Sequence, residues 1–251
     1  MNSPVVADLM KSFGINQEPW VALVSSRDLR DWNHDKEVAY NQKLRQTLKH
    51  EFFMKAVDFL ADNRIPGDYF EFGCHRARTF RMMLSESAKK QALADMRYYA
   101  FDSFAGLPEA SSNPSHPVWS VGALTTSEKD FRCLVESLGL AKDRIHTVPG
   151  FYGQSLTKGL QKEFVSKGRP VAMVNVDCDL YESAVPVFRF LEPMLQEGTV
   201  LYLDDYFCGY RGNPHRGVAL AFEEFREQSR FRFVEHMAIG WWGKSFLAYL
   251  P

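Results

Sequence analysis

Segments of helical spacing alternate with short apolar runs along most of the chain. In the first such segment (35–64), Phe53, Val57 and Leu60 recur every three or four residues, as on one face of a helix, and the "IPG" sequence after it ends the segment. The apolar runs that follow have the length of strands and are rich in aromatic residues. We therefore predict one long helix, followed by strands that alternate with helices.

The predicted elements describe a doubly wound α/β sheet. Strands are expected at 68–74, 97–103, 144–150, 170–177, 199–205, 231–237 and 244–250. Helices are expected at 79–90, at 127–139, through Leu156 to Phe164, through Ala184 to Leu195 and at 217–229. Because five strands alternate with helices and the last two have only a short connection, we predict a mainly parallel sheet with an antiparallel C-terminal end and helices on both faces. The Gly-, Pro- and Ser-rich stretch 105–127 is too long for a tight connection, and such loops are usually functional or disordered.

Length and composition fit one large globular domain. With 251 residues, of which 45% are hydrophobic, the chain can bury a full core. We interpret residues 1–64 as a helical N-terminal extension of the same domain as 65–251. The 30 basic and 31 acidic residues exclude a strongly polybasic surface, which argues against a nucleic acid partner. The chain shows no signal-peptide pattern and no apolar run of ~18 residues, so we expect a cytoplasmic protein without a membrane span.

The cysteines and histidines do not suggest a metal or redox site of their own. The four cysteines are far apart and form no CxxC pair, so we interpret them as reduced thiols in or near the core. The seven histidines are scattered without HxH or HExxH spacing, which leaves a zinc site with little support.

The last residues of the predicted parallel strands are the candidate site, because open α/β sheets bind ligands beyond the carboxyl ends of their strands. At the first strand end, Gly73 lets a ligand approach the backbone closely. At the second, Asp102 could accept two hydrogen bonds from a ribose diol or could cap its own loop. The chain lacks a GxGxxG motif after the first strand, which disfavours dinucleotide binding.

Two further strands end in clustered aspartates, in "VDCDLYES" (176–183) and "LYLDDY" (201–206). If these strands are neighbours ~4.8 Å apart, Asp177, Asp204 and Asp205 meet at the sheet edge. Two unit charges ~4 Å apart repel by ~4 kcal/mol at an effective dielectric of ~20, so the cluster needs a cation, shared protons or nearby arginines. Oxygen donors with open positions suit Mg²⁺ better than an enclosed Ca²⁺ site. A bound divalent cation would also lower the pKa of a coordinated hydroxyl.

Asp179 follows Asp177 by two residues and would lie on the same side of an extended segment. There it could act as a general base on an acceptor hydroxyl. Alternatively, Asp179 could be the N-cap of a helix that begins near Ser183, and Asp205 could accept hydrogen bonds from loop amides.

The strand-end motifs together resemble the macrocin O-methyltransferase family, which includes the mycinamicin and novobiocin sugar methyltransferases. They are "FEFGCHRARTF", "YAFDSFAGLPE", "VPGFYGQSL", "VDCDLYES" and "LYLDDY", in this order. The resemblance implies a class I methyltransferase fold, S-adenosylmethionine as methyl donor, Mg²⁺, and methylation of a sugar hydroxyl on a small glycosylated metabolite or a surface glycan. By motif, it implies Glu71, Gly73, Cys74, Asp102, Ser103, Gly150 and Phe151 as donor-binding residues, Asp177, Asp204 and Asp205 as metal ligands, and Asp179 as the base.

The chain departs from the family pattern in two places. Members usually carry a Gly-rich turn after the first strand, where this chain has Ala77 and Arg78. The first 60 residues, which in such enzymes help to form the substrate side and the oligomer contacts, match no motif. The identity of the acceptor therefore does not transfer, and a homodimer or a higher homo-oligomer stays open.

Candidates for the acceptor side lie outside these motifs. The loop after the second aspartate motif carries Tyr210, Arg211, His215 and Arg216, and it could bind acceptor hydroxyls or could be a solvated connection. Trp241 and Trp242 could stack on a sugar, but between two strands they are more often core residues. His75 could touch the donor or acceptor, or lie on the surface.

Two other function classes remain as alternatives. A catechol-type methyltransferase also chelates two hydroxyls with carboxylates. Those enzymes typically have a lysine soon after the first metal aspartate, whereas Cys178, Asp179 and Leu180 follow Asp177 here. A related hydroxylase or a donor-binding protein without methyl transfer belongs to a different class.

Overall fold

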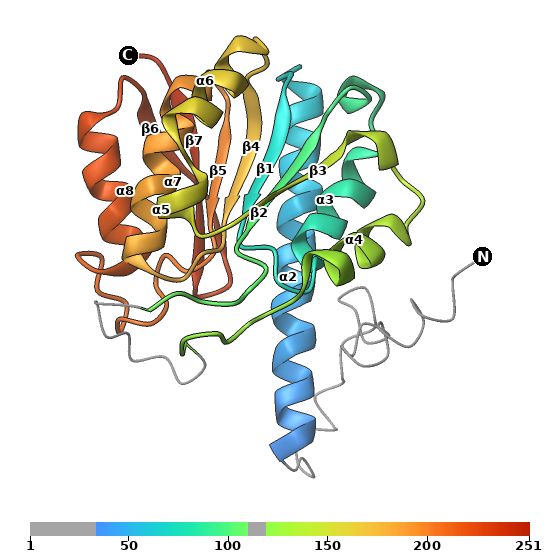
Figure 1. Ribbon diagram of the computed structural model, residues 1–251, viewed down its shortest axis with the longest axis vertical. Coiled ribbons are helices and arrows are strands. Elements are labelled where there is room, and N and C mark those ends of the chain that lie inside the picture. The colour runs from blue at the N-terminus through green and yellow to red at the C-terminus, as the bar shows by residue number, and fades with distance from the viewer. Residues whose placement is uncertain (1–33, 110–118) are drawn as a thin grey trace.

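The computed structural model describes residues 34–109 and 119–251, which form a seven-stranded sheet with helices on both faces (Figure 1). The strands are β1 (Asp68–Phe72), β2 (Tyr98–Asp102), β3 (Ile145–Pro149), β4 (Val171–Val176), β5 (Val200–Leu203), β6 (Arg232–Ile239) and β7 (Gly243–Tyr249). The helices are α2 (His34–Asp62), α3 (Arg78–Ser87), α4 (Glu128–Glu136), α5 (Tyr152–Ser155), α6 (Lys158–Ser166), α7 (Tyr181–Leu191) and α8 (Gly217–Gln228). Short 3₁₀ turns are η3 (Gln91–Leu93), η4 (Lys142–Arg144) and η5 (Glu192–Met194). Residues 1–33 of the predicted extension and 110–118 of the predicted loop lie outside the described residues.

The strand order is β3-β2-β1-β4-β5-β7-β6. The strands from β1 to β5 pair in parallel, and β7 is antiparallel to both β5 and β6. This confirms the predicted mainly parallel sheet with an antiparallel end. The chain runs outward from β1 to β3 and then returns to β4 on the other side of β1. The switch point of the sheet, where ligands of such folds bind, is therefore between β1 and β4.

The helices divide between the two faces of the sheet. Buried residues of α2, α3 and α4 form one apolar cluster with the sheet, and those of α6, α7 and α8 form another on the opposite face. Helix α4 begins at the predicted capping box, where the Ser127 hydroxyl accepts from the Asp130 N–H at 3.1 Å. The single helix predicted through Leu156 to Phe164 is wrong, because Leu156 ends α5 and Thr157 caps a separate helix, α6. Within the described part of the chain, no helix combines the length and apolar character that a membrane crossing needs.

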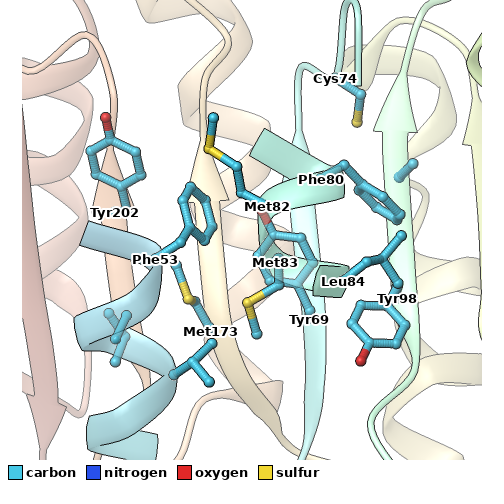
Figure 2. Packing of buried hydrophobic residues seen from close by; sticks show 14 of the residues in the cluster. Phe53, Tyr69, Cys74, Phe80, Met82, Met83, Leu84, Tyr98, Met173 and Tyr202 are labelled. Atoms are coloured by element: carbon cyan, nitrogen blue, oxygen red, sulfur yellow. The ribbon is translucent and has the colours of Figure 1, made fainter. Parts of the chain in front are cut away.

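Helix α2 is anchored in the core by an aromatic residue. Figure 2 shows Phe53 of this helix between Tyr202 of β5 and Tyr69 of β1. The Phe53 ring meets each tyrosine nearly edge to face, with centroids 6.3 Å apart in both pairs. The N-terminal half of α2 runs past the carboxyl ends of the parallel strands (Figure 1), so the anchored helix reaches the edge where the candidate site lies.

Truncation of this anchor should destabilise the whole domain. Phe53→Ala removes a fully buried ring and should lower the free energy of unfolding by about 3–5 kcal/mol, measured by urea denaturation. Met54→Ala, on the neighbouring solvent side at 44% exposure, is the matched control and should change it by less than about 1 kcal/mol. Equal stability of Phe53→Ala and the wild type would show that α2 does not belong to the core.

Candidate active site

A cavity of about 650 Å³ opens at the carboxyl ends of the parallel strands. Its volume is within the range of small-molecule sites, about 300–1,000 Å³. The predicted site residues that line it are Gly73, Cys74, Asp102, Ser103, Gly150, Phe151, Asp177, Asp179, Asp204 and Asp205. Helix α2 adds a wall that the sequence analysis did not assign, with Gln42, Arg45, Gln46 and Lys49. The fold thus brings together ten of the eleven predicted residues, all except Glu71.

Gly73 is required by the close approach of two strand ends. Its φ is 86°, and a Cβ at this position would lie 1.8 Å from the carbonyl oxygen of Asp177. The Gly73 N–H donates to the Phe101 carbonyl at 2.9 Å, and the Asp177 N–H donates to the Phe72 carbonyl at 2.8 Å. No larger residue fits here, so the backbone of the loop after β1 itself forms a wall of the cavity.

Asp102 ties the loop after β1 to its own loop. One carboxylate oxygen, Oδ2, accepts from the N–H groups of Cys74 at 2.7 Å and His75 at 3.2 Å, and Oδ1 accepts from the Phe104 N–H at 2.8 Å. Asp102 therefore has the loop-capping role that was one of its two interpretations. Oδ1 keeps capacity for one more donor, and contact with a ribose stays a prediction.

The end of β3 offers an apolar surface to the same cavity. Gly150, with φ 125°, donates its N–H to the Asp102 carbonyl at 2.9 Å, which holds the turn against β2. The next residue, Phe151, is 37% exposed where it lines the cavity. An aromatic face left open in a cavity suits a flat aromatic ligand. The Ser103 hydroxyl is engaged in its own loop, where it donates to the Gly106 carbonyl at 2.7 Å.

Glu71 does not line the cavity, and its predicted contact with the donor stays a prediction. The carboxylate is fully buried and accepts hydrogen bonds from the hydroxyls of Tyr69 and, at 2.8 Å, Thr79. Alternation along β1 places Glu71 on the same face as Tyr69, which α2 and α3 cover. Burial raises the pKa of Glu71 to about 7. The residue anchors the first turn of α3 beneath the cavity.

The three aspartates predicted as metal ligands form a cluster. One carboxylate oxygen from each of Asp177, Asp204 and Asp205 lies within 4.8 Å of the other two. The cause is the parallel pairing of β4 with β5, in which Val176 is the partner of Leu203 and the next residue of each strand is an aspartate. Burial, together with the charge of Asp204, raises the pKa of Asp205 to about 6.

Lys49 of α2 inserts its ammonium group into this cluster. Its Nζ is 2.7 Å from Oδ2 of Asp204 and 3.5 Å from Oδ2 of Asp177, and its side chain is 9% exposed. Although burial alone would lower the pKa of Lys49, the two carboxylates raise it. Sequence reasoning missed this residue, but a signal existed: Lys49 lies in the helical row of Phe53 and Leu60, where a solvated lysine is not expected.

Asp204 accepts three hydrogen bonds at its carboxylate. Oδ1 accepts from the Tyr202 hydroxyl and from the Trp242 indole N–H, the latter at 3.2 Å, while Oδ2 binds Lys49. Burial alone would raise the pKa of Asp204, but Lys49 holds it below its ordinary value.

The two neighbouring tryptophans differ in burial. Trp242 is buried, as predicted for a core residue, whereas Trp241 is 68% exposed, so the prediction that it belongs to the core is wrong.

The donor set fits a divalent metal ion. Oδ2 of Asp205 is buried and accepts no hydrogen bond from the residues that the structure describes. Oδ2 of Asp204 has one lone pair beyond the one that Lys49 uses. Asp177 is 24% exposed at its side chain and faces the cavity. Three carboxylate oxygens at one edge suit a hard cation.

Asp179 has an unusual backbone conformation. Its φ is 62°, and the Leu180 N–H donates to the Cys178 carbonyl at 2.6 Å, which closes a γ-turn of positive φ around Asp179. Helix α7 begins after Leu180 and has no side-chain cap, so the N-cap interpretation of Asp179 is wrong. Burial and then the charge of Asp205 raise the pKa of Asp179 well above its ordinary value. A buried carboxyl group of raised pKa in a cavity is a candidate base.

The predicted acceptor-side loop does not line the cavity. Arg211, His215 and Arg216 are exposed, as a solvated connection would be. Tyr210 is buried, and its ring centroid lies 6.2 Å from that of Trp119, which does line the cavity. Trp119 was not predicted as a site residue, because it belongs to the irregular stretch between β2 and α4.

The loop between β1 and α3 carries the departures from the family pattern. Ala77 has φ 56°, a conformation that glycine adopts most easily, which accounts for the glycine expected there. Arg78 opens α3 and lines the cavity, so the substitution brings a cation to its wall. His75 also lines the cavity, with Nδ1 2.6 Å from the Leu124 carbonyl, and burial and Arg76 lower the pKa of His75 to about 4.

The raised pKa of Glu71 predicts a pH-dependent contribution to stability. The pKa of Glu71 is about 7 in the folded protein and 4.5 in the unfolded chain, so the folded state binds the proton more tightly. The free energy of unfolding therefore falls as the pH rises from about 4.5 to 7. The loss attributable to Glu71 should approach about 3 kcal/mol. Denaturation across this range should show a shallower fall for Glu71→Gln than for the wild type. Glu136→Gln, at an exposed position of α4, is the control, and parallel curves for wild type and Glu71→Gln would contradict the assignment.

Comparisons with known proteins agree with the motifs. The chain is 28% identical over 186 residues to the 8-demethyl-8-(2,3-dimethoxy-alpha-L-rhamnosyl)-tetracenomycin-C 4'-O-methyltransferase of Streptomyces olivaceus. It is 23% identical over 185 residues to the demethyldecarbamoylnovobiocin O-methyltransferase of Streptomyces niveus. Each alignment covers 70% of this chain and 65% of the relative, so the chain spans just under two thirds of the curated relatives it matches.

A solved structure and a family profile complete the comparison. The calicheamicin methyltransferase CalS11 is 16% identical and shares the fold, with a TM-score of 0.68 over 99% of this chain and 94% of that one. The sequence profile of the macrocin-O-methyltransferase (TylF) family matches residues 16–244. The resemblance predicted from the strand-end motifs is thereby confirmed, and the chain belongs to the macrocin-O-methyltransferase (TylF) family.

Proposed function

We propose that the chain is a metal-dependent O-methyltransferase that moves a methyl group from S-adenosylmethionine to a sugar hydroxyl of a glycosylated metabolite or surface glycan. The observation that carries this proposal is that one cavity holds both the strand-end loops of the family's donor motifs and the buried aspartate cluster. The sugar-modifying activities in the names of the two curated relatives support it.

The loops after β1, β2 and β3 would hold the donor. The remaining acceptor capacity of Asp102 Oδ1 suits a ribose hydroxyl, and the open ring of Phe151 suits the adenine. The close backbone turn at Gly73 leaves room for the amino-acid end beside it. Cys74 and Ser103 line the same part of the cavity and would complete this half of the site.

The acidic half would receive the acceptor. Asp177, Asp204 and Asp205 would hold Mg²⁺, which when bound supplies charge that lowers the pKa of a coordinated hydroxyl. The polar row of α2 that lines the cavity includes Gln46, whose buried Oε1 accepts no hydrogen bond from the described residues. An amide oxygen without a donor can accept a hydrogen bond from a sugar hydroxyl.

Asp179 would take the proton of the acceptor hydroxyl. Its raised pKa makes it a better proton acceptor than an ordinary aspartate, and it lines the cavity beside Asp205. The acceptor oxygen then attacks the methyl carbon in line, and the electrons of the broken carbon–sulfur bond stay on the sulfur. Most of the remaining rate gain would come from holding the two substrates in near-attack geometry.

A catechol-type reaction has less support. It would need a neutral lysine as base near the first metal aspartate, and among the residues that the structure describes Lys49 is the lysine that lines the cavity. Because Asp177 and Asp204 raise the pKa of Lys49, this group stays protonated and does not serve as a base.

Methyl transfer from isotope-labelled S-adenosylmethionine to a panel of glycosides, nucleotide sugars and glycans tests the proposed reaction. We expect transfer to at least one sugar, loss of activity with EDTA, and recovery when Mg²⁺ is restored. Activity that EDTA leaves unchanged would sink the metal part of the proposal. Transfer to catechols without transfer to any sugar would support the alternative reaction.

The division of roles between the neighbouring aspartates predicts different defects. Asp179→Asn should lower turnover by about 10²–10⁴-fold while binding of donor and metal changes only a few-fold, because the base is lost but the ligands remain. Asp177→Asn should instead weaken Mn²⁺ binding. Single-turnover kinetics and calorimetry separate the two effects. If Asp179→Asn turns over at the wild-type rate, the base is another group.

A further inference from the structure

Lys49 occupies an unusual position for a residue next to a metal cluster. Its ammonium group is buried between two of the three aspartates, 2.7 Å from Asp204 and 3.5 Å from Asp177. The residue reaches this point because α2 is fixed to the sheet one turn further on, at Phe53. The cluster therefore has an internal positive charge that belongs to the fold.

The hydrogen bonds of Asp204 show what a metal ion would meet. Oδ1 has two donors, the Tyr202 hydroxyl and the Trp242 indole, and these use both of its lone pairs. A cation can thus bind Asp204 only through Oδ2, the oxygen that Lys49 already contacts. A divalent ion at the cluster and the ammonium group must share one oxygen, and like charges at such separations repel strongly in a buried site.

We infer that Lys49 is a positioning residue that acts as the internal counter-cation of the cluster: it holds Asp177 and Asp204 together without metal and thereby weakens the binding of divalent ions. The inference rests on the metal site of the proposed function, and it names a residue that sets the affinity of this site for divalent ions. Asp205, whose Oδ2 has no such donor among the described residues, is a ligand that the ion can bind without competition from Lys49.

Titration of the purified full chain with Mn²⁺, followed by electron paramagnetic resonance, tests this inference without use of activity. Lys49→Met removes the competing charge and should lower the Kd for Mn²⁺ by about tenfold or more. Lys49→Arg keeps the charge and should stay close to the wild type. Lys55→Met removes an exposed lysine of the same helix, which pairs with Glu51 at 2.6 Å, and should leave the Kd unchanged.

Thermal unfolding gives a second readout. Without metal, Lys49→Met should melt below the wild type because the aspartates lose their counter-charge, and Mn²⁺ should raise its Tm by more than that of the wild type. If this variant does not fold without metal, circular dichroism replaces the Tm. Refolding at Mn²⁺ concentrations below the wild-type Kd supports the inference, and failure to refold overturns it.

The outcomes separate this inference from the proposed function. Wild-type binding with no gain in Lys49→Met, or weaker binding in that variant, overturns the role of Lys49 and leaves the metal site intact. Absence of Mn²⁺ binding in both proteins overturns the metal site together with the inference.

Discussion

Repulsion among the carboxylates at the ends of β4 and β5 is the constraint on which the rest of the site depends. At an effective dielectric of ~20, two charges ~4 Å apart repel by ~4 kcal/mol, which is a large fraction of the net stability of a domain. Helix α2 offsets this repulsion because it brings the positive charge of Lys49 to the cluster. One turn earlier in the same helix, the guanidinium carbon of Arg45 lies 4.6 Å from the ring centroid of Trp242. This helix is therefore part of the site as well as of the core, and the packing of Phe53 fixes the position of the charge.

Beneath the cavity lies a row of polar side chains on the face of the sheet that α2 and α3 cover. Glu71, Asn175 and Tyr202 are register partners on adjacent strands, and all are fully buried. Glu71 binds Thr79 at the start of α3, and Tyr202 binds Asp204. Asn175 lies between them, and neither atom of its side-chain amide has a hydrogen-bond partner among the described residues. The two ends of this row are therefore held separately: Glu71 supports the loop at the donor side, and Tyr202 supports the aspartate cluster.

Local pattern was enough to predict the order of the elements and the acidic strand ends. The aspartate cluster followed from one further step, since parallel neighbours end at the same edge. The side of β1 on which Glu71 lies could not be predicted, because "DYFEF" is buried on both faces and shows no alternation. Lys49 was missed because 128 residues separate it from Asp177 and 155 from Asp204, and a lysine on a long helix usually faces solvent. The predicted homo-oligomeric state and cytoplasmic location stay predictions.

The strained turn at Asp179 shows how the fold fixes the position of the proposed base. An extended segment would place Asp179 on the side of Asp177, but the γ-turn directs the chain straight into α7 and leaves the Asp179 carboxyl next to Asp205. A residue other than glycine with positive φ costs about 1–3 kcal/mol and persists only where its surroundings determine it. Here the chain is fixed both before and after Asp179. Before it, β4 ends in register with β5, and after it, Leu180 is buried at 1% exposure where α7 begins. Glycine would relieve the strain but remove the carboxyl group, so the base proposed at this point has to be a strained aspartate.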